Sequence, residues 1–338
     1  MKINKKPIFY LLFVLIGVFM FWIALKNQDF SEILKQIYLA DYSWAILIFF
    51  ITVVNHIFRA LRWTLLFEPL RYEISVKNAF LAILFGYFVS LGIPRFGEIS
   101  RCIVLKQQNN VPVNISIGTV FTERLIDIFC LFILIVSVFF FQHAAFEAIF
   151  RKFIISPIQN ILIADAIKII FLLSLLIIVI SILIFLIFKK YKNILFFEKC
   201  IQFLSQVKAG ILSFIILKNK KLFFLYTVLI WVGYFFMTYC WFPSLKATSQ
   251  LSWEAGFTLL VVGSLGKSVP IQGGGFGAYH FLITQTLIFF GVASQFGFAL
   301  AMIIHGFQTL FYLISGIAVW IYLLFEKRNI SPNSFNNK

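Results

Sequence analysis

The chain has 338 residues, of which 61% are hydrophobic and only 12% are charged, and its mean hydropathy is +0.96. Soluble domains are about 45–50% apolar and about 25% charged, so this composition excludes a soluble globular protein and indicates a polytopic integral membrane protein. The formal net charge is +16, which in a soluble chain would suggest a nucleic-acid partner. Here the basic residues lie mostly in short loops between apolar runs, as the positive-inside rule describes, and we expect no nucleic-acid binding.

Apolar runs recur along the chain. A transmembrane helix needs about 20 residues, and runs near this length occupy residues 8–25, 44–66, 117–142, 161–188, 222–243 and 296–325. Shorter runs occupy residues 79–93, 255–269 and 276–292. A helix of about 15 residues reaches only about 22 Å, which is short of the ~30 Å hydrocarbon core. The shorter runs therefore need a different explanation from the longer ones.

Clusters of basic residues predict the orientation. Lysines at 189–192 and 218–221 flank a segment that must be cytoplasmic, and the lysines at both ends of the chain indicate that both termini are cytoplasmic. The crossings between the N-terminus and Lys189 must then be even in number, whereas the intervening apolar runs are odd in number. The shortest of them, 79–93, is therefore predicted to be a hairpin that enters from the cytoplasm and returns by Arg101.

Glycine and proline interrupt both short regions. The segment Ile93-Pro94-Arg95-Phe96-Gly97 breaks the first, and a glycine-rich segment after Val269-Pro270 breaks the second. Backbone that is broken at membrane depth survives only inside protein or against a cavity, and transporters commonly build substrate sites from two such segments. The short arms and glycine-rich tip of 255–292 favour a second hairpin that enters from outside, although two plain crossings give the same parity.

The expected fold is an all-α polytopic integral membrane protein with about six full spans plus two re-entrant Gly/Pro hairpins, which would enter from opposite faces as an inverted repeat requires. About eight plain spans are the alternative. We expect a transmembrane domain over residues 1–325 and a disordered cytoplasmic tail over 326–338. An amphipathic helix over about 192–217 is expected to lie on the inner leaflet, although a helix that simply connects two spans is equally compatible.

Charged residues inside apolar runs cost about 2.5–3.5 kcal/mol each on insertion scales and mark candidate sites. At the inner end of the second span, Arg59 and Arg62 share one helix face by their i,i+3 spacing. They suit a clamp for a headgroup phosphate, because a guanidinium group matches phosphate in a bidentate fork. The alternative is that both arginines snorkel to the headgroups while Trp63 anchors the interface.

The first hairpin carries Arg95, Glu98 and Arg101 at and after its turn. Glu98 and Arg101 are spaced i,i+3 and can neutralise each other if the returning arm is helical. They form either a structural pair that closes the hairpin or part of a polar floor for an anionic substrate, because Pro94 and Gly97 also free backbone groups at that depth.

The next long run opens with Glu123, Arg124 and Asp127. Glu123 and Asp127 share a helix face at i,i+4, where two like charges are unfavourable and need a partner. Arg124 reaches Asp127 at i,i+3, and the arginines of the first hairpin are the nearest further candidates. The group forms either an ion-pair network that braces the hairpin or a site whose carboxylate couples the movement of a proton or cation.

The second hairpin concentrates polar and flexible groups. Its glycines permit close backbone approach and positive φ angles, and a helix that restarts near Phe276 would attract an anion through its free N–H groups. The alternative is that the glycines only pack helices together. The candidate substrate-binding residues of this hairpin are Lys267, Gln272, Gly273, Gly274, Gly275, Gly277 and His280.

Signatures of soluble enzymes are missing from the sequence. It contains no P-loop, no metal-ligand spacing such as H-E-x-x-H and no nucleophile elbow. No loop is long enough to form a catalytic domain. We therefore expect no catalytic residues, no metal and no cofactor, and we do not expect an enzyme.

An ordered set of segments carries a family resemblance. Arg59-Ala60-Leu61-Arg62-Trp63, then Pro94-Arg95-Phe96-Gly97-Glu98-Ile99-Ser100-Arg101, then Thr122-Glu123-Arg124-Leu125-Ile126-Asp127 resemble the flippase-like membrane region of lysylphosphatidylglycerol synthases and multiple peptide resistance factors. The resemblance spans roughly residues 8–325. It implies a protein of the bacterial or archaeal inner (plasma) membrane whose relatives move, or are proposed to move, a lipid between leaflets. No aminoacyl-transferase domain follows in this sequence, so synthesis of a lysyl lipid is not implied.

The favoured hypothesis is a flippase for a phospholipid or another lipid with an anionic headgroup, so membrane phospholipids are the expected partners. The arginines would hold the headgroup phosphate, the carboxylates would orient the arginines or carry a coupling proton, and the glycines of the second hairpin would form an opposing gate. The alternatives are an ion-coupled transporter of a small anion, a lipid-modifying transferase with Glu123 or Asp127 as base, and a non-catalytic membrane partner of a cell-envelope enzyme.

Overall fold

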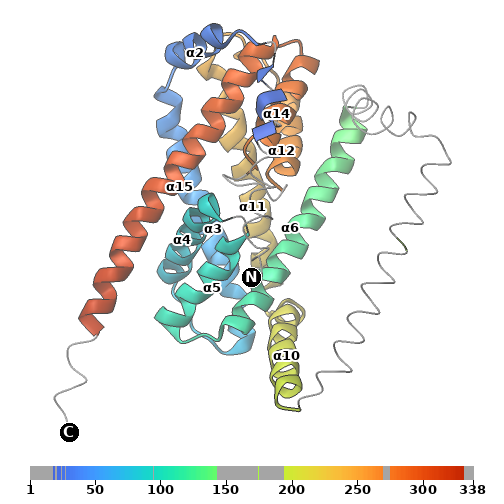
Figure 1. Cartoon of the computed structure of the whole chain (residues 1–338). Coiled ribbons are helices and arrows are strands. Elements are labelled where there is room, and N and C mark those ends of the chain that lie inside the picture. Colours follow the sequence, from blue (N-terminus) through green and yellow to red (C-terminus); the bar gives the residue numbers. More distant parts are fainter. Residues whose placement is uncertain are drawn as a thin grey trace.

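A computed structural model describes residues 18–19, 21–23, 25–26, 28–93, 95–142, 174, 194–268 and 275–330 of the chain, without the side chains of 194–203 and 327–330. This described part consists of helices and contains no strand (Figure 1). The expected all-α fold is therefore confirmed for these residues.

Four helices of the described part are long and apolar enough to cross a bilayer. They are α3 (Ser43–Leu65), α6 (Val113–Phe141), α11 (Lys220–Tyr239) and α15 (Ser294–Ile330). They confirm the spans predicted at 44–66, 117–142, 222–243 and 296–325. The spans predicted at 8–25 and 161–188 lie wholly or largely outside the described residues.

Two helices form the first predicted hairpin. Helix α4 (Val76–Gly92) begins at Ser75, whose hydroxyl accepts a hydrogen bond from the Asn78 N–H, and α5 (Phe96–Asn109) begins after Arg95, whose φ of 65° lies in the left-handed region. The two helices pack closely, because a Cβ added at Gly86 would lie 2.7 Å from the Gly97 carbonyl oxygen. Helix α5 has 14 residues, too few to cross a ~30 Å core at 1.5 Å per residue.

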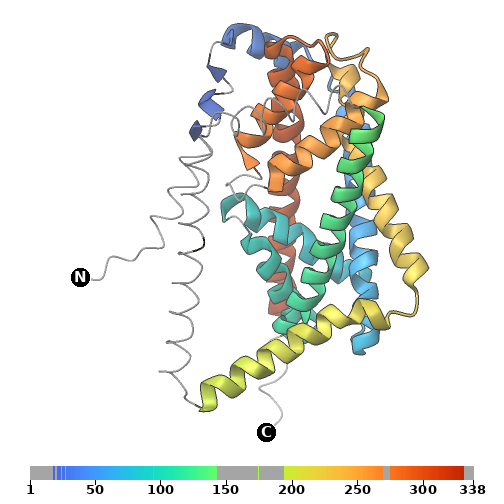
Figure 2. The same cartoon turned by 90° about the vertical axis from the view of Figure 1, so that its right-hand side faces the viewer.

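The second hairpin has the same form at the other end of the molecule. Helices α12 (Trp253–Ser268) and α14 (Ala278–Phe289) pack against each other, with Gly266 against the backbone of Tyr279. Figures 1 and 2 show α4 and α5 in the lower half and α12 and α14 in the upper half, and Arg95, directly before α5, contacts Ser268 at the end of α12. With 16 and 12 residues, both arms are too short for full crossings.

Shorter helices lie at the two ends. Helix α2 (Phe30–Leu39) lies at the upper end, and the 3-10 turns η1 (Glu68–Leu70) and η3 (Phe242–Ser244) follow α3 and α11. Helix α10 (Ile194–Ile216) runs obliquely across the lower end in Figure 2 and packs on α6. This packing is close, because a Cβ added at Gly118 would lie 2.8 Å from the Gly210 Cα.

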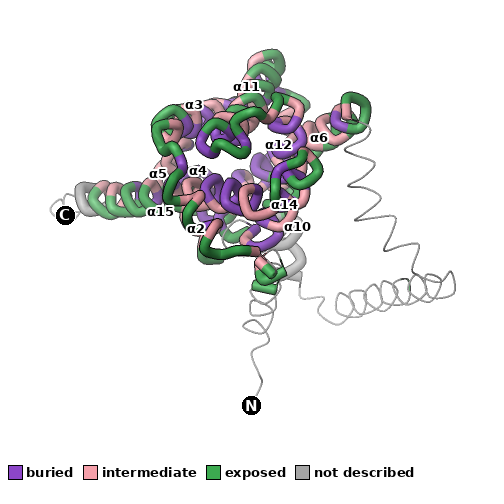
Figure 3. Tube along the Cα trace, turned by 90° about the horizontal axis from the view of Figure 1, so that it is seen from above, coloured by how far each residue is buried: buried purple, intermediate pink, exposed green. Residues whose placement is uncertain are grey.

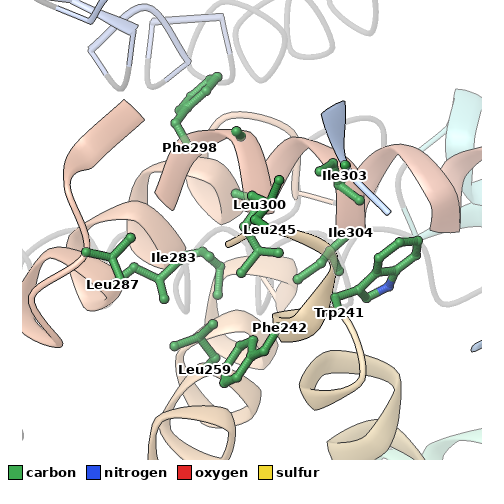
Figure 4. Packing of buried hydrophobic residues seen from close by; sticks show 14 of the residues in the cluster. Trp241, Phe242, Leu245, Leu259, Ile283, Leu287, Phe298, Leu300, Ile303 and Ile304 are labelled. Atoms are coloured by element: carbon green, nitrogen blue, oxygen red, sulfur yellow. The ribbon is translucent and has the colours of Figure 1, made fainter. Parts of the chain in front are cut away.

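Two apolar cores hold the ends of the bundle. The upper core joins η3, α12, α14 and α15 through Trp241, Leu259, Ile283 and Ile304 (Figure 4). The lower core is centred on Trp63 and joins α3, α4, α5, α6 and α11. Seen from above, many residues of α4, α12 and α14 are buried, whereas the outlying stretch of α15 is largely exposed (Figure 3). Helix α15 ends at Ile330 and so continues into the start of the expected tail, whose residues 331–338 lie outside the described part.

Candidate functional site

A buried ion-pair network joins three helices beside the lower core. Glu123 of α6 is fully buried and accepts hydrogen bonds from Arg101 of α5, with Nη2–Oε2 at 2.8 Å, and from Arg62 of α3, with Nη2–Oε1 at 3.4 Å. Its carboxylate therefore fixes both α3 and the returning arm of the first hairpin against α6. The sequence predicted an arginine of the hairpin as the partner of this carboxylate, and Arg101 confirms it.

A second carboxylate extends the network along α6. Asp127 accepts a hydrogen bond from Arg62, with Nη1–Oδ1 at 2.8 Å, and pairs with Arg124 at 3.3 Å. The Arg124–Asp127 pair is the one expected from the i,i+3 spacing. Glu98 pairs with Arg124 across helices at 3.4 Å. The Glu98–Arg101 pair, one of the two alternatives for these residues, is not formed within α5, because Arg101 reaches into the protein toward Glu123 while Glu98 stays on the half-exposed side.

Aromatic and hydroxyl groups hold the remaining faces of the arginines. The Arg101 guanidinium lies 4.4 Å from the centre of the Trp63 ring, and the Trp63 indole N–H donates to the Thr119 hydroxyl at 3.0 Å. Trp63 and Arg62 are both fully buried, so neither snorkels nor anchors an interface. A stacked cation of this kind keeps its orientation while its remaining N–H groups stay available.

Arg59 differs from the other arginines of the network. Its side chain is 4% exposed, and no carboxylate within salt-bridge distance pairs with it among the described residues. Its Nη1 donates to the Tyr234 hydroxyl at 3.1 Å, and its guanidinium lies 5.2 Å from the centre of the Tyr87 ring. Its Nε has no hydrogen-bond partner in the described part of the chain. A buried guanidinium without an anion is costly unless a ligand supplies one.

A cavity of about 100 Å³ lies beside these arginines. At roughly 30 Å³ per molecule it has room for about three waters or one phosphate-sized group. Its lining comes from α3, from the close-packed arms of the first hairpin and from α6. The lining residues are Arg59, Ile83, Gly86, Tyr87, Ser90, Gly97, Glu98, Arg101 and Arg124.

The charges around this cavity do not balance. The four guanidinium groups of Arg59, Arg62, Arg101 and Arg124 face three carboxylates, which leaves one positive charge in excess. The Arg101 Nη1 atom, like the Arg59 Nε, has no hydrogen-bond partner among the described residues. Both arginines therefore retain donor capacity beside the cavity, and this capacity suits an anion with several acceptor oxygens. The described residues contain no group of three or more His, Cys, Asp or Glu that could hold a metal ion.

The chain is similar to known membrane proteins over most of its length. The family model described as the lysylphosphatidylglycerol synthase TM region matches residues 10–316. The chain belongs to this family. A UPF0104 membrane protein of the archaeon Methanocaldococcus jannaschii is 29% identical over 145 residues, which cover 41% of this chain and 42% of the relative. No solved structure matches the chain.

Membership of the lysylphosphatidylglycerol synthase TM region family makes the chain a multi-pass membrane protein, in agreement with its four long apolar helices. The family model describes a membrane region, and the match gives no sign of a catalytic domain within residues 10–316. Three segments carried the resemblance, around Arg59, Arg95 and Glu123. They contribute residues of α3, α5 and α6 to one network. Arg95 lies outside this network.

The remaining candidates lie at the junction of the two hairpin tips. Arg95 donates from Nη2 to the carbonyl oxygen of Ser268 at 2.8 Å, and Lys267 lies next to it on α12. His280 is buried on α14, and its Nδ1 accepts a hydrogen bond from the N–H of Gly277 at 3.3 Å. Gly275 and Gly277 have φ angles of 88° and 84°, as the prediction of positive φ requires. Gln272, Gly273 and Gly274 lie outside the described residues.

Sequence reasoning missed several residues that contact Arg59 or line the cavity. Tyr87 and Tyr234 flank Arg59, although Tyr234 lies 175 residues away in the chain. Gly86 lies directly against Gly97 at the cavity wall. A glycine within the short run 79–93, next to a tyrosine, is the one local signal for a close backbone approach there. The same pattern, Gly233 next to Tyr234, stands in α11, where Gly233 lies against Asn55 of α3, but the pattern alone does not identify Arg59 as the partner of Tyr234.

Proposed function

We propose that this protein binds the phosphate group of an anionic lipid in the cavity beside Arg59 and moves that lipid between the leaflets of the membrane. The observation that carries the proposal is the buried guanidinium of Arg59, which lines the cavity without a carboxylate partner in the described part of the chain. Membership of the lysylphosphatidylglycerol synthase TM region family supports it, because the family is a membrane region named for lipid synthases.

The charge balance favours a singly charged ligand. One excess guanidinium would be neutralised by one negative charge, which is the charge of the phosphodiester that links a phospholipid headgroup to its glycerol. Arg59 and Arg101 both line the cavity, and a guanidinium group donates to phosphate oxygens in a fork. In this proposal Glu123, Asp127 and Glu98 orient the arginines, because each of them already pairs with one.

The proposed topology follows the arrangement of the helices. About six full spans would enclose two re-entrant hairpins that enter from opposite faces, as inverted repeats of transporters do. The short arms of the hairpins and the contact of Arg95, directly before α5, with Ser268 at the end of α12 support this proposal. Lys218, Lys220 and Lys221 lie at the lower end, where α11 begins, so we assign that end and both termini to the cytoplasm. The oblique helix α10 would then lie at the inner leaflet.

The test is lipid translocation in proteoliposomes that contain labelled phosphatidylglycerol or labelled phosphatidylcholine. The full chain should move phosphatidylglycerol faster than phosphatidylcholine: both carry the phosphodiester, but the quaternary ammonium of choline adds a positive charge beside a cavity that already has one in excess. Arg59→Gln should lower this rate at least tenfold, because it removes the buried guanidinium that lines the cavity without a carboxylate partner among the described residues. Glu98→Ala should also lower it, because Glu98 holds Arg124 at the cavity. Lys106→Gln removes a positive charge from the exposed end of α5 and is the matched control.

Movement that is independent of headgroup charge, or an unchanged rate in Arg59→Gln, would contradict the proposal. The cavity volume of about 100 Å³ also suits a small free anion, which is the second candidate. Uptake of radiolabelled inorganic phosphate into vesicles of phosphatidylcholine, without any redistribution of labelled lipid, would favour that alternative.

A further inference from the structure

The structure separates the predicted cationic residues into two groups. Arg59, Arg101 and Arg124 line the cavity, and Arg62 joins the same network through Glu123 and Asp127; three carboxylates accompany these four arginines. Arg95 and Lys267 instead lie where the turns of the two hairpins meet, and both side chains belong to exposed residues. The sequence had placed all of these residues in one substrate site.

Arg95 connects the two hairpins directly. It is the residue before the first turn of α5, and its Nη2 reaches across to the carbonyl oxygen of Ser268, the last residue of α12. No salt bridge joins Arg95 to a carboxylate among the described residues. A carbonyl oxygen takes one of the five N–H donors of a guanidinium and leaves its charge without a counter-ion.

Lys267 lies beside this contact and is also without an acidic partner in the described part of the chain. Its Nζ donates to the Gln308 side-chain oxygen at 2.5 Å and lies 4.6 Å from the centre of the Tyr279 ring. The acidic residue of α12 is Glu254, thirteen positions earlier, which places it about 20 Å away along the helix axis. The amide and the aromatic ring orient the ammonium group without neutralising it.

Arg95 and Lys267 are two cations at membrane depth without counter-ions among the described residues, and this arrangement favours the binding of an anion. Charged side chains within the membrane are costly and typically mark pathways of ions or substrates. The junction also adjoins the cavity, because Gly97 and Glu98, in the first turn of α5 directly after Arg95, line the cavity wall. An anion held at the junction is therefore one helical turn of α5 from the cavity wall.

We propose that Arg95 and Lys267 form a second binding station for the headgroup phosphate of the transported lipid, separate from the cavity beside Arg59. This inference rests on the proposed function and assigns a path to it: the phosphate passes between the cavity and the junction as the lipid crosses. Tyr279 and Gln308 are positioning residues, because they hold the Lys267 ammonium group in place. The second hairpin thus contributes a cation, Lys267, to the path.

The test uses the full chain in mixed micelles with phosphatidylglycerol that carries a photoreactive diazirine on its headgroup. After irradiation, adducts are mapped by peptide mass spectrometry. We expect adducts in two places, near the cavity on α3 and α6, and near the junction at the start of α5 and the end of α12. The double variant Arg95→Gln/Lys267→Gln should lose junction adducts about tenfold and keep cavity adducts, because each substitution removes a charge-assisted contact. Arg59→Gln should show the opposite pattern.

Control variants separate charge recognition from folding. Arg95→Lys/Lys267→Arg keeps both charges and should keep junction adducts, and Lys106→Gln should leave both sites labelled. Junction adducts that persist in the double glutamine variant, or that disappear together with cavity adducts in Arg59→Gln, would overturn the second station. Equal junction labelling by photoreactive phosphatidylcholine would overturn it too, and so would loss of the junction adducts on adding excess inorganic phosphate, which would assign the site to a free anion.

The two proposals can fail separately. Charge-dependent junction labelling, together with no lipid movement in proteoliposomes, would support the second station and reject the transport function. Lipid movement that is lost in Arg59→Gln and unchanged in the double variant would support the transport function and reject the second station.

Discussion

The two hairpins have the same backbone form and are held in place by different forces. In each, two short helices approach closely at a glycine, Gly97 in the first and Gly266 in the second. The first hairpin packs in the lower apolar core and is also attached to its neighbours by ion pairs, through Arg101 to Glu123 and through Glu98 to Arg124. The second has no salt bridge among its described residues and is embedded in the upper apolar core.

This difference indicates that the charged residues of the first hairpin hold it in position, whereas the polar groups of the second hairpin remain available to bind a ligand. Charges that saturate one another hold a hairpin in one orientation, and their removal exposes an uncompensated partner. Apolar packing holds a hairpin equally firmly while its few polar groups remain available. We therefore expect substitutions of charged residues to affect stability in the first hairpin and ligand binding in the second. The following predictions test this contrast, from the largest expected effect to the smallest.

The largest effect is expected at Glu123. Glu123→Gln keeps the shape of the side chain but leaves Arg62 and Arg101 without their shared buried carboxylate, and we expect a loss of about 3–5 kcal/mol in the free energy of unfolding. Glu254→Gln is the matched control on the second hairpin, where no salt bridge is lost among the described residues, and should change stability by less than about 0.5 kcal/mol. Reversible unfolding in mixed micelles measures both. Equal losses would show that ion pairs do not hold the first hairpin.

The glycine contact comes next. A Cβ at Gly97 would overlap the carbonyl oxygen of Gly86 and the hydroxyl of Ser90, so Gly97→Ala must separate the two arms and should lower the free energy of unfolding by about 1–3 kcal/mol. It should also change the cavity, because Gly86, Ser90 and Gly97 all line it. Gly92→Ala on the same hairpin meets no atom within 4 Å and is the matched control. If both variants were equally stable, the arms would not depend on this contact.

A smaller effect is expected at Lys267. Lys267→Met removes a hydrogen bond to Gln308 but leaves no carboxylate unpaired among the described residues, so the free energy of unfolding should change by no more than about 1 kcal/mol. Arg101→Met is the comparison on the first hairpin and should cost more, because Glu123 then keeps Arg62 alone. Thermal unfolding of the two variants side by side measures the contrast. A larger loss in Lys267→Met would mean that its charge stabilises the fold.

The sequence predicted the parts of this arrangement that depend on local spacing or on length. The four described spans follow from apolar runs near 20 residues, and the Arg124–Asp127 pair follows from i,i+3 geometry. Local spacing gave no means of choosing between partners on different helices. Arg62 pairs with Asp127, 65 residues away, and this choice depends on how α3 and α6 pack. For the same reason local spacing did not decide between the alternatives for Glu98 and Arg101, and the two do not pair, since Arg101 has the buried Glu123 as its partner.

The smallest effect is expected at Glu98. Its side chain is 39% exposed and lies 3.4 Å from Arg124, which also pairs with Asp127. Glu98→Gln should therefore lower the free energy of unfolding by only a few tenths of a kcal/mol, because half-exposed pairs contribute little and Arg124 keeps a second carboxylate. The same variant should lower lipid translocation, since Glu98 lines the cavity. The free energy of unfolding and the transport rate of Glu98→Gln are measured side by side. A loss of stability as large as that of Glu123→Gln would show that Glu98 helps to hold the first hairpin in place. The contrast between positioning and binding would then distinguish the two hairpins from each other but not the residues within the first.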